Sequence, residues 1–156
     1  MKSIKYFLAI VVIAVIGATG CNTGYHSVSF FLHHTESGNY AYIYQKEKGV
    51  SYYVNINGKI SGPYYYVSDL LLTESGNHAY SYKEKEELYN NAYVSINGEI
   101  SGPYDYVSDL LLTESGNYAY QYLKVKEEYG GWYVNINGEI SGPYDSVQYD
   151  LPHRER

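Results

Sequence analysis

Most of this chain consists of near-copies of one unit of about 40 residues, a period typical of repeat architectures. A single unit of this size cannot bury its own hydrophobic side, so the repetition predicts supersecondary units stacked against one another. The best-matched blocks, 57–77 and 97–117, differ only at the aligned pairs Lys59/Glu99 and Tyr65/Asp105.

Each unit is expected to contain four short antiparallel strands. In the unit that ends near Gly142 the expected strands are 106–113, 118–122, 132–136 and 139–141. The run of Leu110, Leu111 and Leu112 predicts that the first of these strands is buried on both faces. Asn137-Gly138 predicts a type I′ hairpin turn, since both positions of that turn need a positive φ. Pro143 is expected to end the fourth strand, because proline cannot donate to a sheet ladder.

The same strands can be placed in every unit. The second strands are expected to begin at Tyr40, His78 and Tyr118, and the third strands to pass through Tyr53, Tyr93 and Tyr133. The fold class predicted from the residues is therefore all-β, with three four-stranded antiparallel repeat units over residues 25–151 and a short tail at 152–156.

The repeated phrase resembles the units of the TolB-like, WD40-like β-propellers of bacteria. The matching positions are Asn97-Gly98, Gly102-Pro103-Tyr104-Asp105, Val107, Ser115-Gly116-Asn117 and Ala119-Tyr120. The usual Ser-Pro-Asp-Gly turn of that family is replaced here by Glu-Ser-Gly-Asn. The resemblance implies that each unit forms one propeller-like blade and that the protein serves as a binding platform. No enzymatic activity is expected, because near-identical repeats leave no unique catalytic constellation.

The number of blades leaves four arrangements open. Closed propellers usually have about 4 to 8 blades, and this chain supplies a partial propeller of three. Two chains could complete one six-bladed ring, a different partner could complete an open fan, or the chain could be a truncated product. Three units of this length could also form a β-trefoil, which closes alone.

The N-terminus has the pattern of an export signal. Lys2 and Lys5 precede an apolar run over 7–16, which is shorter than the roughly 20 residues that span a bilayer. The segment Ala18-Thr19-Gly20-Cys21 resembles the lipobox of bacterial lipoproteins. That resemblance implies a signal peptide over 1–20, lipid attachment at Cys21 and a short linker over 21–24. We therefore expect an envelope protein anchored in a membrane by its lipid, the outer membrane if the source is Gram-negative and the cell membrane otherwise.

No catalytic, metal or cofactor site is expected from the sequence. His33 and His34 are adjacent in a strand, so their side chains point to opposite faces and cannot easily share one ion. The serines of the Ser-Gly-Asn turns lack the surroundings of a nucleophile elbow. The formal net charge is −6, which disfavours nucleic acid as a partner.

The tyrosines are the best functional candidates, and the chain has 23 of them. Alternation places Tyr40, Tyr42 and Tyr44 on one strand face, and Tyr118, Tyr120 and Tyr122 on another. Such faces could bind sugar rings or peptide, or they could fill the space between stacked sheets. The expected function is protein binding or self-association at the envelope, with carbohydrate or cell-wall binding through the tyrosine faces as the alternative.

Overall fold

The chain folds into three separate four-stranded antiparallel sheets, as the repeats predict. The structure is a computed structural model that describes residues 27–45, 51–84, 86, 91–125 and 130–146, and within them the chain forms strands and no helix. Sheet 1 contains β1 (Ser27–His34), β2 (Tyr40–Gln45), β3 (Tyr52–Ile56) and β4 (Lys59–Tyr64). Sheet 2 contains β5 (Tyr66–Leu72), β6 (His78–Lys83), β7 (Ala92–Ile96) and β8 (Glu99–Tyr104). Sheet 3 contains β9 (Tyr106–Leu112), β10 (Tyr118–Lys124), β11 (Gly131–Ile136) and β12 (Glu139–Tyr144).

The predicted strand starts and hairpins are confirmed. The second strand of each sheet begins at Tyr40, His78 or Tyr118. Asn137 and Gly138 have φ values of 51° and 91°, so the β11–β12 turn has the positive φ at both positions that a type I′ hairpin requires. The side chain of Asn137 also accepts a hydrogen bond from the backbone N–H of Tyr118 at 2.8 Å, which ties this hairpin to β10.

The prediction that Pro143 ends the fourth strand is wrong. Strand β12 continues to Tyr144, and a register shift between Trp132 and Val134 of β11 absorbs the Gly142-Pro143 pair as a bulge. The strand tolerates proline because β12 is the edge strand of sheet 3, where a missing N–H breaks no second ladder.

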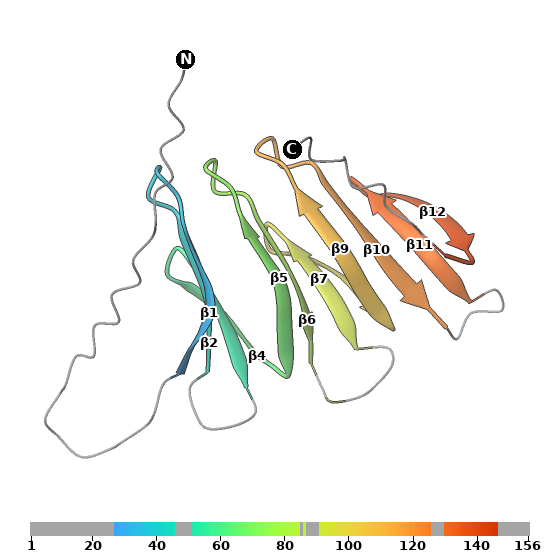
Figure 1. Cartoon of the computed structure of the whole chain (residues 1–156), viewed down its shortest axis with the longest axis horizontal. Helices are drawn as coiled ribbons and strands as arrows, with labels where there is room; N and C mark the ends of the chain where they lie inside the picture. Colours follow the sequence, from blue (N-terminus) through green and yellow to red (C-terminus); the bar gives the residue numbers. More distant parts are fainter. Residues whose placement is uncertain (1–26, 46–50, 85, 87–90, 126–129, 147–156) are drawn as a thin grey trace, which may run out of the picture.

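The three sheets stack side by side as an open fan, with sheet 2 in the middle (Figure 1). The first strands contact one another in succession, β1 with β5 and β5 with β9. This arrangement is that of propeller-like blades rather than of a β-trefoil, and the fan is not closed. The expected signal peptide 1–20, the linker 21–24 and the tail 152–156 lie outside the described residues.

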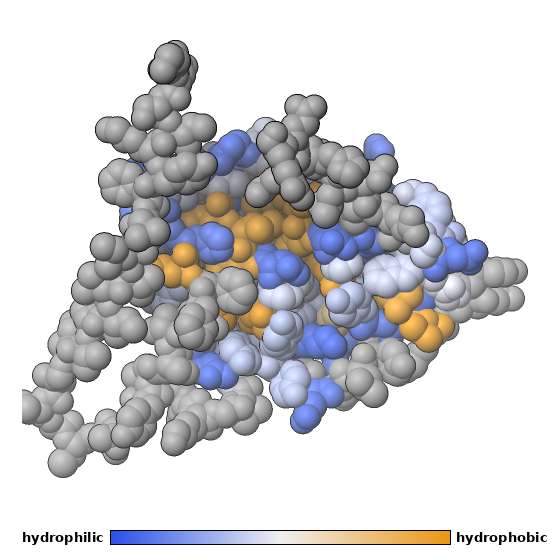
Figure 2. Space-filling model, viewed as in Figure 1, coloured by the Kyte–Doolittle hydropathy of each residue, from blue (hydrophilic) through white to orange (hydrophobic). Residues whose placement is uncertain are grey.

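The hydrophobic core lies between the sheets. We call the side of a sheet toward the next sheet in the chain its forward face, and the opposite side its backward face. One buried cluster joins sheets 1 and 2, and its members are Ala41, Ile43, Val54, Val67, Leu70, Tyr80 and Tyr82. A second cluster joins sheets 2 and 3, and its members are Ala79, Ala92, Val94, Tyr104, Val107, Leu110, Tyr120 and Tyr122. Figure 2 shows hydrophobic residues gathered toward the middle of the fan.

The leucine run packs against neighbouring sheets on both faces only where a sheet lies on both sides. In β5, Leu70 packs toward sheet 1 and Leu71 packs toward sheet 3. In β9, Leu110 is 5% exposed, whereas Leu111 is 54% exposed. The prediction of burial on both faces is therefore wrong for β9, because the forward face of sheet 3 has no sheet packed against it among the described residues.

Candidate binding surfaces

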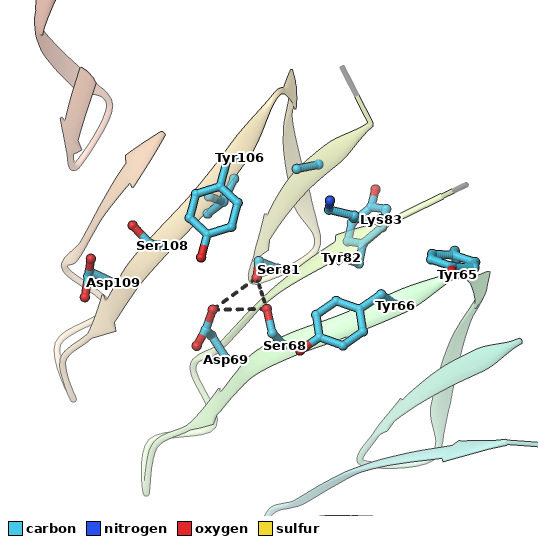
Figure 3. A pocket seen from close by; sticks show the side chains of 12 residues that line it. Tyr65, Tyr66, Ser68, Asp69, Ser81, Tyr82, Lys83, Tyr106, Ser108 and Asp109 are labelled. Carbon is cyan, nitrogen blue, oxygen red and sulfur yellow. Dashed lines mark hydrogen bonds between the residues drawn. The ribbon is translucent and has the colours of Figure 1, made fainter. Parts of the chain in front are cut away.

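A pocket of about 570 Å³ opens between sheets 2 and 3, beside their first strands. Its size lies within the range of roughly 300 to 1,000 Å³ that is typical of small-molecule sites. Polar and aromatic side chains from β5, β6 and β9 line it, and Figure 3 shows them. The lining includes Tyr66, Ser68, Asp69, Ser81, Lys83, Tyr106, Ser108 and Asp109.

Two aspartates reach this pocket because they occupy bulges in the first strands. Asp69 and Asp109 have φ values of 52° and 54°, in the left-handed region that Asp tolerates better than most residues. The register of β5 against β6 shifts between Ser68 and Leu71, around Asp69. A bulge re-aims a side chain in this way, and bulges often lie near functional sites. Neither aspartate is among the site residues predicted from the sequence. The signal that could have indicated them is one charged residue inside an apolar strand, repeated in two units.

Hydrogen bonds hold each aspartate in place. The hydroxyls of Ser68 and Ser81 donate to Oδ2 of Asp69 at 3.1 and 3.2 Å, and the two serine oxygens lie 2.6 Å apart (Figure 3). In sheet 3, Nε2 of Gln121 donates to Oδ2 of Asp109 at 2.6 Å. The pocket therefore offers fixed carboxylates and hydroxyls beside the exposed phenols of Tyr66 and Tyr106. Such a combination suits a ligand that carries several hydroxyl groups.

The predicted tyrosine faces exist as ladders of rings, but they differ in access. Tyr118 stacks on Tyr120 at 6.2 Å and Tyr122 stacks on Tyr133 at 5.2 Å between ring centroids. Tyr120 and Tyr122 are buried in the core between sheets 2 and 3, so neither ring is open to a ligand. These two tyrosines fill space between sheets.

The equivalent rings of sheet 1 remain accessible. Tyr40, Tyr42 and Tyr44 of β2 are each half-buried, with Tyr40 and Tyr42 stacked at 6.3 Å. They lie on the backward face of sheet 1, because the matching residues of β6, Tyr80 and Tyr82, face backward into the core between sheets 1 and 2. This part of the tyrosine prediction therefore falls on an open end of the fan.

A repeated glutamate contact joins the turns of neighbouring sheets. The carboxylate of Glu74 accepts hydrogen bonds from the backbone N–H groups of Glu36 and Ser37, both at 3.0 Å. The carboxylate of Glu114 accepts the same pair of bonds from Glu74 and Ser75, both at 3.1 Å. We call this contact the glutamate clamp. The sequence predicts only turns at these residues, because nothing local indicates that the carboxylate reaches the preceding unit.

The clamp changes the acidity of Glu74. Hydrogen bonds from the backbone N–H groups of Ser37 and Glu36 stabilise its carboxylate and lower its pKa below the usual 4.5. The pKa values of two core tyrosines are instead raised. Burial, together with the neighbouring Tyr80, raises the pKa of Tyr82 to about 12. Burial likewise raises the pKa of Tyr104, with a contribution from its hydrogen bond to Tyr120.

Both ends of the fan expose residues whose counterparts are buried inside it. On the forward face of sheet 3, Leu111 and Ile136 are 54% and 53% exposed. The counterparts of Ile136 in sheets 1 and 2, Ile56 and Ile96, pack against the core clusters. On the backward face of sheet 1, Leu32 is 55% exposed, whereas its counterpart Leu70 is 2% exposed. The two end faces therefore carry residues of the internal junctions, but no sheet packs against them among the described residues. Exposed apolar patches often mark interaction sites.

In the described ranges, no group of three or more His, Cys, Asp and Glu side chains is placed to hold a metal ion. No helix within that part of the chain is long and apolar enough to cross a membrane. Cys21 lies outside the described residues, so its lipidation stays a prediction.

Comparisons of the chain with protein-family models, with curated proteins and with solved structures found no match.

Proposed function

We propose that this chain is a non-enzymatic, lipid-anchored module of the bacterial cell envelope whose stacked sheets bind protein. The exposed forward face of sheet 3 is the observation that carries the proposal, since Ile136 and Tyr144 are exposed there whereas their counterparts in sheets 1 and 2 pack against the cores between sheets. The lipobox-like segment that ends at Cys21 supports the membrane anchor, and the propeller-like stack supports a binding role.

The forward face has the composition of a protein-binding surface rather than of a catalytic one. Leu111, Ile136 and Tyr144 combine two aliphatic side chains with an aromatic one, and all three are exposed. Burial of such residues at an interface contributes about 25 cal/mol for each Å² of apolar area removed from water, which is offset in part by the entropic cost of association. A protein partner can contact side chains on three different strands at once, whereas a small ligand occupies a pocket.

A photo-crosslinking phenylalanine analogue placed at Leu111 of the full, membrane-anchored chain tests the proposal. We expect ultraviolet light to give a covalent protein adduct. The matched control carries the same analogue at Ile100, which is 63% exposed on the edge strand β8 and away from both end faces. Equal adduct yields at the two positions would remove the forward face as a binding site.

The anchor has its own test. A clickable fatty acid fed to cells should label the chain, and Cys21→Ser should abolish the label and release the protein from the membrane fraction. Labelling that survives this substitution would place the lipid elsewhere.

The pocket between β5 and β9 supports carbohydrate binding as the second candidate function. Its fixed carboxylates and serine hydroxyls can bind sugar hydroxyls, and Tyr66 and Tyr106 offer rings for stacking. We expect Asp69→Asn and Tyr106→Ala to weaken binding on a glycan or cell-wall array. Asp145→Asn is the matched control, since Asp145 is exposed and lies outside this pocket. Binding that none of these changes alters would rule the pocket out.

A further inference from the structure

The two junctions inside the fan are built from the same contacts at the turns. Besides the glutamate clamp, the hydroxyls of Ser37 and Ser75 donate to the backbone carbonyls of Glu74 and Glu114 at 2.6 and 2.7 Å. The side-chain amides of Asn39 and Asn77 donate to the same two carbonyls at 3.0 and 2.9 Å. Each turn therefore carries one half of a contact on each side: N–H, hydroxyl and amide donors toward the next sheet, and a glutamate toward the preceding one.

The core of each junction repeats as well. The hydroxyl of Tyr64 in β4 lies 3.1 Å from that of Tyr80 in β6, and the hydroxyl of Tyr104 in β8 lies 3.0 Å from that of Tyr120 in β10. The ring of Tyr64 packs 4.2 Å from Tyr82 between centroids, as the ring of Tyr104 packs 4.2 Å from Tyr122. A tyrosine on the fourth strand of one sheet thus packs against two tyrosines on the second strand of the next sheet.

Each end of the fan keeps the main contacts of one half of this junction. The forward end of sheet 3 presents the turn of Glu114, Ser115 and Asn117, and the exposed fourth-strand Tyr144. The repeat spacing makes Tyr144 the counterpart of Tyr64 and Tyr104, since the three occupy the same Gly-Pro-Tyr phrase.

The backward end of sheet 1 presents the matching half. The carboxylate of Glu36 corresponds to those of Glu74 and Glu114, and the half-buried rings of Tyr42 and Tyr44 correspond to Tyr80 and Tyr82. Leu32 is exposed where Leu70 is buried. The two end faces thus carry counterparts of residues that meet at the internal junctions, and this correspondence favours a further copy of the repeat as the partner.

We propose that the forward face of sheet 3 binds the backward face of sheet 1 of a second copy of this chain. In this contact the Glu36 carboxylate of one copy accepts from the backbone N–H groups of Glu114 and Ser115 of the other, and Tyr144 packs against Tyr42 and Tyr44. The inference rests on the proposed function, because it names the partner of the same exposed face.

The geometry of the fan limits how many copies join. A head-to-tail contact forms a ring when its rotation closes and an open filament when it does not. The first strands of neighbouring sheets contact one another in succession, as the innermost strands of propeller blades do. Two copies of a three-sheet chain supply six sheets, within the roughly 4 to 8 blades of closed propellers. The assembly is therefore a two-chain ring that contains the new contact twice.

Pairwise cysteine cross-linking tests the contact in the membrane-anchored full chain. One copy carries Glu36→Cys, a co-expressed copy carries Ser115→Cys, and a short thiol-directed cross-linker is added. We expect a species of twice the chain's mass that is missing when either substituted copy is expressed alone. Glu36→Cys paired with Glu99→Cys is the matched control, since Glu99 is an exposed hairpin residue outside both end faces. Ser37→Cys with Glu74→Cys in one chain checks the reagent, because that internal clamp should link without a change in mass.

Substitutions of the end faces give a second readout. In sedimentation of the detergent-solubilised chain, Leu111→Glu should convert the dimer to a monomer, and Ile100→Glu should leave it intact. Glu36→Gln, which removes a charge from the acceptor of two N–H groups, should weaken association about tenfold. A chain that stays monomeric while its internal cross-link forms would overturn the inference. If Leu111 of that monomer still photo-crosslinks to a different protein, the proposed function stands and only the identity of the partner changes.

Discussion

The two leucines that follow Leu70 and Leu110 offer a direct test of the open-ended stack. Leu71 and Leu111 lie in the same sequence, Tyr-Val-Ser-Asp-Leu-Leu-Leu-Thr-Glu-Ser-Gly-Asn, so local propensity and strand position are equal. Leu71 packs against the core between sheets 2 and 3, whereas Leu111 is 54% exposed. Any difference between Leu71→Ala and Leu111→Ala in the monomer therefore reports the presence or absence of the next sheet.

The expected losses in the free energy of unfolding follow from how deeply each leucine is buried. Leu110, which is 5% exposed, should show the full cost of a core truncation, about 3 kcal/mol from the loss of transfer free energy and the cavity that remains. The partly buried Leu71 should cost about 2 kcal/mol when it is changed to alanine. Leu111 should cost less than about 1 kcal/mol, because more than half of it already lies in water.

Thermal or chemical unfolding of dilute, monomeric protein measures this order. A loss of about 3 kcal/mol lowers the Tm of a domain of this size by roughly 10 °C, so the three variants separate clearly. If the forward face binds a second copy, the cost of Leu111→Ala should rise with protein concentration, since association stabilises only the folded state. Equal costs for Leu71→Ala and Leu111→Ala at the lowest concentration would show that the face is already covered, and would refute the reasoning.

Three further outcomes follow from the backbone and the titrating groups. Gly102→Ala should destabilise by about 2 kcal/mol or more in denaturant titrations, because Gly102 has a φ of 130° and a Cβ there would lie 2.8 Å from the carbonyl oxygen of Ala92. Because the pKa of Glu74 is lowered in the folded state, its carboxylate stabilises the fold above pH 4.5, and this stabilisation is lost as the pH falls through the lowered pKa. Glu74→Gln should therefore flatten the acid side of a plot of Tm against pH more than Glu99→Gln does. The pKa of Tyr82 is raised to about 12, so its contribution is complete below pH 10 and is lost as the pH rises toward 12. Absorbance at 295 nm should therefore show a group of tyrosines that ionises only when circular dichroism reports unfolding.

The parts of the fold that depend on short-range rules could be predicted from the sequence. Each Asn-Gly pair fixes a hairpin because its backbone needs a positive φ, and the Tyr118-Ala119-Tyr120 alternation fixes a strand and its register. The repeat period then predicts stacked units, since one sheet of this size has no core of its own.

The parts that depend on position within the stack could not be predicted. Gly142-Pro143 looks like a strand end, and only the edge position of β12 lets a bulge carry the strand past it. Asp109 looks like one polar residue in a regular strand, and only the bulge in β9 directs it into the pocket. Tyr120 and Tyr42 have the same strand context in the sequence. Tyr120 is a core residue because a sheet packs on it, whereas Tyr42 is only half-buried.

The end faces follow from the near-identity of the repeats. Repeat proteins that stand alone usually end in a capping unit with a polar outer face, because the last unit has no neighbour to cover its apolar side. Sheet 3 instead keeps interior residues: Leu111 matches Leu71, Ile136 matches Ile96, and Tyr144 matches the buried Tyr104. Exposure of such an apolar face to water is unfavourable. At the internal junctions the backward face of the next sheet covers it, and sheet 1 has a backward face of the same kind. The residues that form the internal junctions thus recur on the two end faces of the fan, and this recurrence is the basis for proposing a second copy of the chain as the partner.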